Sequence, residues 1–243
     1  MDRLLELTSR AEVSHFWFRG FRNFVVPTLA RAAGGRTDLT LLDCGCGTGY
    51  NLTLLAPYGR SYGTDLNITG LRMARRVGQP LVRADATTLP FHAEQFDIVT
   101  SFDMLQSVPD DGAAVRELAR VLKAGGSLVL TVAAFEILHG DHSLLAEDVR
   151  RYSRAAVLAL LADAGLQPQR VTYAFATLFP IVLAVRLAQR LWRGHSAATG
   201  QEIAVPPPLV NELLAAVVSG EAALARFVSM PFGSSLVVLA RKP

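Results

Sequence analysis

The sequence predicts an α/β protein in which 243 residues form one domain around a doubly wound, mostly parallel sheet of seven strands. Three observations predict this fold. Short apolar runs alternate with helical patterns from residue 39 onward, which is typical of βαβ units. A glycine-rich loop follows the first apolar run, where such folds bind their ligands. The chain is also 51% hydrophobic and long enough to bury a full core.

The elements are predicted in chain order from hydrophobic periodicity and from turn residues. Residues 1–38 have a helical pattern and precede the first strand. A turn at Lys123-Ala124-Gly125-Gly126 is expected to end the helix before the fifth strand, with glycine as its C-terminal cap. The predicted strands are 39–44, 60–65, 80–84, 96–101, 126–133, 168–174 and, antiparallel to the others, 233–241. The predicted helices of the core are 50–57, 67–77, 111–123 and 153–164.

Residues 175–232 separate the last two strands and are too many for a structureless loop. We expect helices at 178–192 and 207–227. In the first of them Arg186, Arg190 and Arg193 recur at helical spacing and would share one face. We expect this insertion to pack on the core and roof a pocket. Peripheral membrane contact through 178–193 and a dimer interface stay open as alternatives.

The loop after the first strand reads Asp43-Cys44-Gly45-Cys46-Gly47-Thr48-Gly49. Glycines at this spacing allow a sharp turn and a close approach of the backbone to a ligand. In a dinucleotide-binding G-x-G-x-x-G turn the third glycine would come one residue later. Cys44 and Cys46 are too close together to staple a fold, and no second pair completes a zinc site. They are interpreted as small loop residues.

Two further acids follow later strands: Asp65 ends the second strand, and Asp85-Ala86 follows the third. Together with the acid-x-G-x-G-x-G loop, they resemble class I S-adenosylmethionine (SAM) dependent methyltransferases. The resemblance implies a Rossmann-like fold that uses SAM as cofactor and releases S-adenosyl-L-homocysteine (SAH). It further implies a helical lid at 1–38, a SAM-binding core at 39–174 and 233–243, and a helical insertion at 175–232.

The resemblance also implies cofactor-binding roles for individual residues. Asp65, followed by Leu66, would accept both ribose hydroxyl groups, Asp85 would accept from the adenine amino group, and the Ala86 backbone would meet the ring edge. The backbone near Phe102 would contact the methionine end of SAM. A histidine is frequent in the family where Ser107 stands. The remaining implied contacts come from the first loop and from the lid: Asp43, Gly45, Cys46, Gly47, Gly49, Trp17 as a pocket wall and Arg19 as partner of the methionine carboxylate. Docking of the lid on the core is the alternative role of its aromatic residues.

The segment after the fifth strand carries the candidate catalytic residues. His139 and His142 flank Asp141 at the carboxyl edge of the sheet, where they could deprotonate an acceptor, and Tyr152 follows. A hydrogen-bonded loop is the alternative, with Arg150 or Arg151 paired to Asp141, Glu147 or Asp148. Two histidines and one aspartate are a thin ligand set, so no metal is predicted.

Composition narrows the function. The net charge is only +3, and the absence of a dense basic tract argues against nucleic acid as a partner. Charged residues near the N-terminus do not form a secretory signal, so a cytoplasmic location, with peripheral membrane contact as an option, is expected. The sequence predicts transfer of a methyl group from SAM to O, N or C of a small lipophilic acceptor. A non-catalytic SAM-binding protein, a membrane-peripheral methyltransferase for a lipid-like acceptor, and an aminopropyl transferase are the alternatives. A monomer and a homodimer are both compatible with the sequence.

Overall fold

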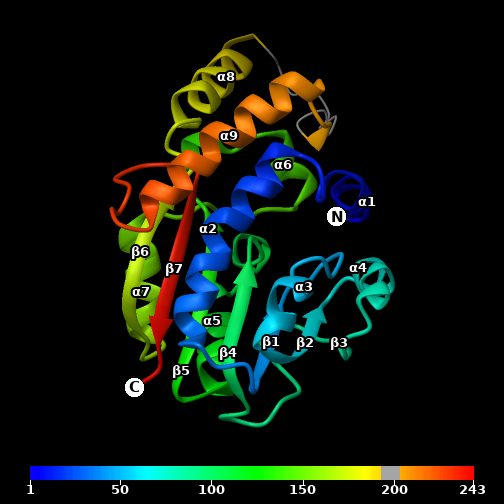
Figure 1. The fold of residues 1–243 in the computed structure, drawn as a ribbon, viewed down its shortest axis with the longest axis vertical. Helices are drawn as coiled ribbons and strands as arrows, with labels where there is room; N and C mark the ends of the chain where they lie inside the picture. Colours follow the sequence, from blue (N-terminus) through cyan, green and yellow to red (C-terminus); the bar gives the residue numbers. More distant parts are fainter. Residues whose placement is uncertain (193–202) are drawn as a thin grey trace.

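The computed structural model describes residues 1–192 and 203–243, except for the side chains of 141–142 and 190–192. Its seven strands form one sheet in the order β3-β2-β1-β4-β5-β7-β6, as Figure 1 shows. β7 runs antiparallel to its neighbours β5 and β6, and the other pairs are parallel. The predicted fold class is therefore confirmed. The strands are β1 (Leu39–Cys44), β2 (Gly59–Asp65), β3 (Leu81–Arg83), β4 (Phe96–Phe102), β5 (Leu122–Ala133), β6 (Gln167–Ala174) and β7 (Ser235–Arg241).

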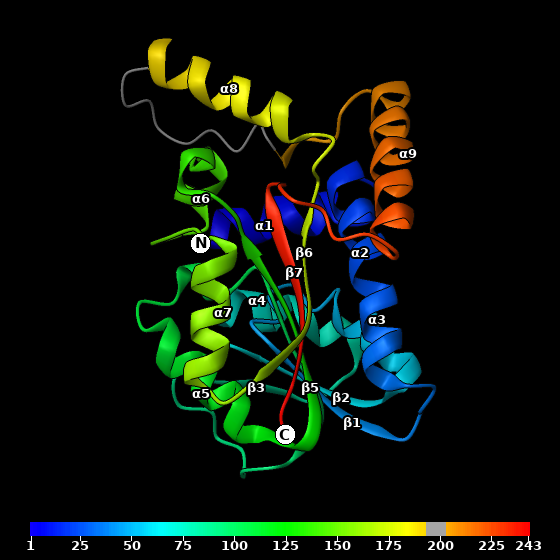
Figure 2. The same cartoon turned by 90° about the vertical axis from the view of Figure 1, so that its left-hand side faces the viewer.

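Helices cover both faces of the sheet (Figure 2). One face packs on α5 (Asp111–Val121) and α7 (Arg154–Asp163), and the other packs on α2 (Phe16–Ala33) and α4 (Ile68–Ala74). Adjacent residues of β1 serve the two faces: Leu42 belongs to the first apolar cluster and Leu41 to the second. Burial on both sides explains why the central strands β1 and β7 are mostly apolar rather than alternating.

Three local predictions were wrong. The helix expected at 50–57 is reduced to α3 (Leu52–Leu55) and a 3₁₀ turn at Ala56–Tyr58, because Pro57 has no N–H for the next helical hydrogen bond. No glycine cap ends α5, since Leu122 already adopts an extended conformation and begins β5. The third concerns the loop after β5, which contains a short helix, α6 (Asp141–Leu145), that was not predicted.

The remaining helices lie above the carboxyl edge of the parallel strands (Figures 1 and 2). They are α1 (Asp2–Ala11) from the N-terminal segment, and α8 (Phe179–Trp192) and α9 (Pro208–Ala225) from the insertion. The amide of Asn211 on α9 accepts from the Phe16 N–H and donates to the Ser14 carbonyl, which fixes α9 beside α2. Among the described helices, α9 alone has the length and apolar composition for a membrane span, and 33% of it is buried in the protein.

Candidate cofactor and acceptor site

A cavity of about 1160 Å³ opens at the carboxyl edge of the sheet, beneath α1, α2 and α8. A site for one drug-sized ligand measures roughly 300–1,000 Å³. The cavity therefore has room for a cofactor and part of a second molecule. Its wall joins the glycine loop and the ends of β2, β3 and β4 to apolar residues of the insertion.

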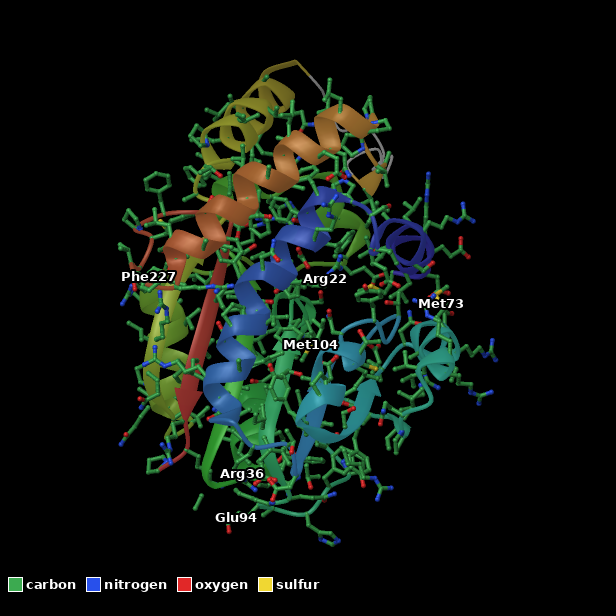
Figure 3. All side chains as sticks on the ribbon, in the orientation of Figure 1. Arg22, Arg36, Met73, Glu94, Met104 and Phe227 are labelled. Carbon is green, nitrogen blue, oxygen red and sulfur yellow. The ribbon has the colours of Figure 1, made fainter. Side chains whose placement is uncertain are left out.

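The glycine loop forms one wall because its backbone is packed too closely for side chains. Gly45 has φ 82°, and a Cβ there would lie 2.4 Å from Cγ of Met104. Gly49 has φ 82° as well, and a Cβ there would lie 2.6 Å from the Cβ of Ala74. Both positions require glycine on steric and conformational grounds. Figure 3 shows Met104 beside this loop, below Arg22 of α2.

Asp65 connects the end of β2 to this loop. Its two carboxylate oxygens accept hydrogen bonds of 2.8 Å from the N–H groups of Gly47 and Asn67. Burial raises the pKa of Asp65, and these backbone hydrogen bonds oppose that rise. Each oxygen retains a further lone pair, so the carboxylate can accept a ligand hydroxyl group on either side.

Asp85 lies exposed at the mouth of the same wall. Its Oδ1 accepts from both the N–H and the hydroxyl group of Thr87, and these bonds lower the pKa of the carboxyl group. An ionised acceptor at this place suits an amino group of a ligand. The sequence-predicted cofactor residues that line the cavity are Trp17, Gly45, Cys46, Gly47, Asp65, Leu66, Asp85, Ala86 and Phe102.

Asp43 and Gly49 do not line the cavity but support the loop from behind. Asp43 is buried, its Oδ1 accepts a 2.7 Å hydrogen bond from the Thr100 hydroxyl group, and burial raises its pKa to about 7. Its Oδ2 has no hydrogen-bond partner among the described residues. Cys44 is buried beside it, and burial raises the pKa of this thiol to about 12. The thiol is therefore inert, as expected for a small loop residue.

Arg19 is a correction to the predicted site. Its guanidinium group forms a bidentate ion pair with the carboxylate of Glu212 on α9, and the residue does not line the cavity. Arg22, one turn further along α2, lines it instead: it donates to the Glu12 carbonyl and lies 4.9 Å above the Tyr50 ring. The helical spacing of the cavity residues Phe18, Phe21 and Arg22 is the signal that could have identified it.

Trp17 combines both of the roles considered for it. Its ring stacks on Phe175 with 3.9 Å between centroids and an interplanar angle of 2°. It also lines the cavity. The same aromatic side chain thus docks α2 on the core and forms part of the wall.

Tyr152 is a second correction. The residue is buried in the core, and its hydroxyl group donates a 2.8 Å hydrogen bond to Asp111. Burial raises the pKa of this phenol, and the side chain does not line the cavity. Tyr152 therefore has a structural role rather than the predicted catalytic one.

The two histidines differ in what the structure describes. His139 is half-buried and does not line the cavity, and the side chain of His142 lies outside the described residues. The loop around them is hydrogen-bonded, as the alternative interpretation proposed. The charges of Arg151 and Asp148 interact, which is one of the pairs considered, whereas Arg150 has other partners. Arg150 donates to the carbonyls of Val108 and Pro109 and pairs with Asp111 at 3.0 Å. Among the described residues no group of three His, Cys, Asp or Glu side chains could hold a metal ion.

Sequence reasoning missed the acids of the opposite wall. Asp103 follows β4 with a left-handed φ of 49°, and its carboxylate faces the cavity. Asp103 is exposed to the solvent of the open cavity, but the protein that surrounds it and the charge of Asp148 raise its pKa to about 6. The hydroxyl group of Thr131 and the charge of Arg151 act against this rise. Asp148 lies on the same wall and accepts a 3.2 Å hydrogen bond from Ser107, and burial raises its pKa as well. Asp103 directly follows the predicted contact at Phe102, which was the available signal.

The end of the cavity beneath α8 is mainly apolar, with Leu138, Leu178, Val182 and Val185 on its wall beside Arg186. The predicted basic face of α8 does not hold at Arg186, whose side chain is buried and donates to the Leu138 carbonyl. The side chain of Arg190 and the whole of Arg193 lie outside the described residues.

Comparison with known proteins points to one family. Residues 42–130 match the family model of a methyltransferase domain. The demethylmenaquinone methyltransferase of Roseiflexus castenholzii is 35% identical over 162 residues, which make up 64% of this chain and 65% of that protein. The ubiquinone/menaquinone biosynthesis C-methyltransferase UbiE of Shewanella sediminis is 31% identical over 180 residues, or 58% of this chain and 71% of that protein. The chain thus spans just under two thirds of the first of these relatives.

A solved structure resembles the whole chain. Haemonchus contortus phosphoethanolamine N-methyltransferase 2, in complex with SAM, aligns with a TM-score of 0.66 and 18% identity, covering 100% of this chain and 57% of that chain. At this identity the likeness supports the fold alone.

Proposed function

The chain belongs to the class I SAM-dependent methyltransferases, and from this premise we propose that it transfers a methyl group from SAM to a small lipophilic acceptor. The observation that carries the proposal is the continuity of one cavity. Its first end has the glycine loop and two strand-terminal acids, and its second end has the apolar wall beneath α8. Cofactor and acceptor would meet between these ends, next to Phe102 and Asp103.

The residues of the first end fit the groups of SAM. Asp65 would accept the ribose hydroxyl groups and Asp85 the adenine amino group, beside the Ala86 backbone. The glycine loop admits the methionine part because Gly45 and Gly47 place no side chain in its path. Arg22 is the cation on this wall that could pair with the methionine carboxylate.

When bound, SAM supplies a methyl group on a sulfonium, which is already activated for displacement. The protein then has to hold donor and acceptor in line and exclude water. The helices α1 and α2 would act as the lid, with Leu4, Leu5 and Phe21 on the cavity wall. These apolar side chains would help to exclude water from the site.

The acceptor proposal rests on the chemistry of the second end. A flat ring with an apolar substituent would bury its surface against Leu178, Val182 and Val185. The names of the two relatives refer to menaquinone and ubiquinone, which supports a quinone-type ring as the acceptor of this chain. A polyamine, the substrate of an aminopropyl transferase, would not match this apolar wall.

Two measurements test the proposal. We expect SAH to raise the melting temperature, because a ligand that binds only the native state stabilises it. We also expect SAH to form when the protein is supplied with SAM and 1,4-dihydroxynaphthalene, a ring of the proposed type. Binding of SAH without turnover would favour the non-catalytic alternative. No binding of SAH would contradict the whole proposal.

Exposed apolar side chains on the insertion favour membrane contact as a second candidate property. Leu209 and Leu213 of α9 are 74% and 59% exposed, and Ile181 of α8 is 61% exposed. Figure 3 shows Phe227, which follows α9, pointing outward at the edge of the molecule. Apolar groups in this arrangement would insert at a bilayer interface. The protein would then act on a lipid-like acceptor while remaining a cytoplasmic enzyme.

Sedimentation with vesicles tests this second candidate. Wild-type protein is expected to pellet with phosphatidylcholine–phosphatidylglycerol vesicles, and Leu209→Glu with Leu213→Glu should stay in the supernatant. The control is Thr37→Glu with Gln167→Glu, which adds the same two charges at exposed residues of the opposite edge of the sheet. Equal sedimentation of all three proteins would contradict membrane contact through this surface.

A further inference from the structure

The wall between the two ends of the cavity carries a set of polar side chains, the polar cluster, whose members are Asp103, Gln106, Asp148, Arg151 and Ser234. They come from three separate segments of the chain: the turns directly after β4, the loop after α6, and the residue before β7. Polar groups that converge on one cavity from distant segments are typical of a binding site rather than of a solvated surface.

Asp103 is fixed in place by β5. Its N–H donates a 3.0 Å hydrogen bond to the Thr131 carbonyl, and its Oδ1 accepts a 3.1 Å hydrogen bond from the Thr131 hydroxyl group. The left-handed backbone at Asp103 is uncommon for a residue with a side chain, and such backbone strain gathers at functional sites. The result is a carboxylate directed at the cavity from a rigid strand end.

Three buried atoms of the polar cluster have no hydrogen-bond partner in the described part of the chain: Oε1 of Gln106, Oδ2 of Asp148 and Oγ of Ser234. Gln106 and Ser234 are only 2% and 5% exposed. Buried polar atoms are normally satisfied, so these three indicate a polar ligand group or ordered water in the cavity. Oε1 of Gln106 is an acceptor, and it needs a donor such as a hydroxyl group.

The charges around Asp103 limit the kind of polar ligand group that can bind beside it. Arg151 faces Asp103 and Asp148, and its own neighbours include Glu136 and Arg186. His139 adds a favourable interaction with Asp148. Two charges act directly on Asp103: the carboxylate of Asp148 raises its pKa, and the guanidinium of Arg151 lowers it. Arg151 would stabilise an oxyanion that forms beside Asp103. A neutral hydroxyl group on an unsaturated carbon fits this balance of charges.

We propose that Asp103 is a catalytic residue that removes the proton from a phenolic or enolic hydroxyl group of the acceptor, with Gln106 and Ser234 as further partners of the acceptor's polar groups. This inference rests on the proposed function and names the reacting group of its acceptor.

In the proposed step, each bond that forms is matched by a bond that breaks. The O–H bond of the acceptor breaks, and Asp103 takes the proton while the electron pair stays on the acceptor. That pair, on oxygen or on the ring carbon next to it, forms the new bond to the methyl carbon. The pair of the broken methyl–sulfur bond remains on sulfur, so SAH is the second product. If the ring carbon was methylated, it then loses its own proton and the hydroxyl group is restored. Asp103 finally returns its proton to solvent.

Ligand binding tests the assignment without turnover. The protein is saturated with SAH, and the binding of 1-naphthol is measured by calorimetry between about pH 5 and about pH 8. An ionised Asp103 accepts the hydroxyl hydrogen bond more strongly than a protonated one, so 1-naphthol should bind about tenfold more tightly at the upper end. Asp103→Asn should abolish this pH dependence and bind 1-naphthol about tenfold more weakly at about pH 8.

Matched controls identify the cause. Naphthalene, which lacks the hydroxyl group, should bind wild type and Asp103→Asn alike at every pH. Asp163→Asn removes an exposed acid on α7, paired with Arg116, and should behave as wild type. SAH should bind Asp103→Asn and wild type equally well. A loss of SAH binding in Asp103→Asn would instead show that Asp103 holds the amino group of the cofactor, and would overturn the proposal.

The binding results distinguish a wrong base from a wrong acceptor site. Binding of 1-naphthol to the SAH complex with an affinity that depends neither on pH nor on Asp103→Asn would contradict the role of Asp103 as a base. That result would leave the proposed apolar acceptor site supported. If neither 1-naphthol nor naphthalene binds the wild-type protein, both the proposed acceptor site and the proposed base are contradicted. In the turnover assay with 1,4-dihydroxynaphthalene, Asp103→Asn should lower kcat at least about 100-fold with little change in the KM for SAM, and Asp103→Glu should restore part of it.

Discussion

The hydroxyl group of Thr48 in the glycine loop donates a 2.5 Å hydrogen bond to Oε2 of Glu12, directly after α1. Both residues are buried, and the other carboxylate oxygen of Glu12 pairs with Arg76. The proposed lid is therefore attached at one carboxylate to the loop that would hold the cofactor. Leu5 of α1 also packs over this loop, 3.5 Å from the position of a Cβ at Gly47.

We expect Glu12→Gln to weaken this attachment. The change removes the charge that pairs with Arg76 and weakens a buried, charge-assisted hydrogen bond, so the free energy of unfolding should fall by about 1–2 kcal/mol. Denaturant unfolding of the apo protein measures this loss. The dissociation rate of SAH should rise severalfold at the same time, because the lid opens more easily.

The control for Glu12→Gln is Glu212→Gln, which removes the same charge from the exposed Arg19–Glu212 pair. Ion pairs at the surface contribute little, so this variant should match wild type in both stability and SAH dissociation. Equal effects of the two substitutions would mean that the Glu12 attachment does not hold the lid.

Asp65→Ala should remove most of the affinity for SAH. The substitution deletes the acceptors for two ribose hydroxyl groups, and it frees the Gly47 N–H that shapes the loop. Loss of one charged hydrogen bond costs about 1.5–3 kcal/mol, so calorimetry should show at least about 10- to 100-fold weaker binding. Asp38→Ala, at the opposite edge of the sheet, is the control. Unchanged SAH affinity in Asp65→Ala would place the cofactor elsewhere.

Tyr152→Phe separates a structural role from a catalytic one. The variant loses the hydrogen bond to Asp111 but keeps the buried ring, so it should be less stable by about 0.5–1.5 kcal/mol. Turnover at a temperature well below unfolding should equal that of wild type. A large drop in kcat with unchanged stability would return Tyr152 to the catalytic residues.

Asp43 predicts a pH dependence of stability in the apo protein. Its pKa is raised from 3.8 to about 7, so the folded state holds this proton more tightly than the unfolded state. Stability is therefore greatest below the unfolded pKa and falls as the pH rises through the folded value, by about 4 kcal/mol in all. The difference between the unfolding free energies at about pH 5 and about pH 8 should be much smaller in Asp43→Asn than in wild type. An equal decrease in wild type and variant would rule out Asp43 as the source.

The sheet could be predicted from sequence because its information is local. The central strands β1 and β7 are short, mostly apolar runs that are buried along most of their length. Asp65 ends β2, and Asp85 lies two residues beyond the end of β3. The glycine loop could be predicted for the same reason. Gly45 and Gly49 both have φ 82°, a conformation that glycine adopts readily and other residues do not.

The catalytic side could not be predicted because its residues depend on distant contacts. Tyr152 is held by Asp111, 41 positions away, and Asp103 by Thr131, 28 positions away. The rotation of α2, which turns Arg22 rather than Arg19 toward the cavity, follows from the stacking of Trp17 on Phe175. No short-range pattern encodes these pairs.

A crystal structure of the protein with SAH is the most decisive experiment for the proposed site. We predict that the ribose hydroxyl groups bind Asp65, that the adenine lies between Asp85 and Ala86, and that the sulfur faces Asp103 across the space left for an acceptor. SAH bound outside this cavity, or bound with its sulfur turned away from the apolar wall beneath α8, would contradict this prediction.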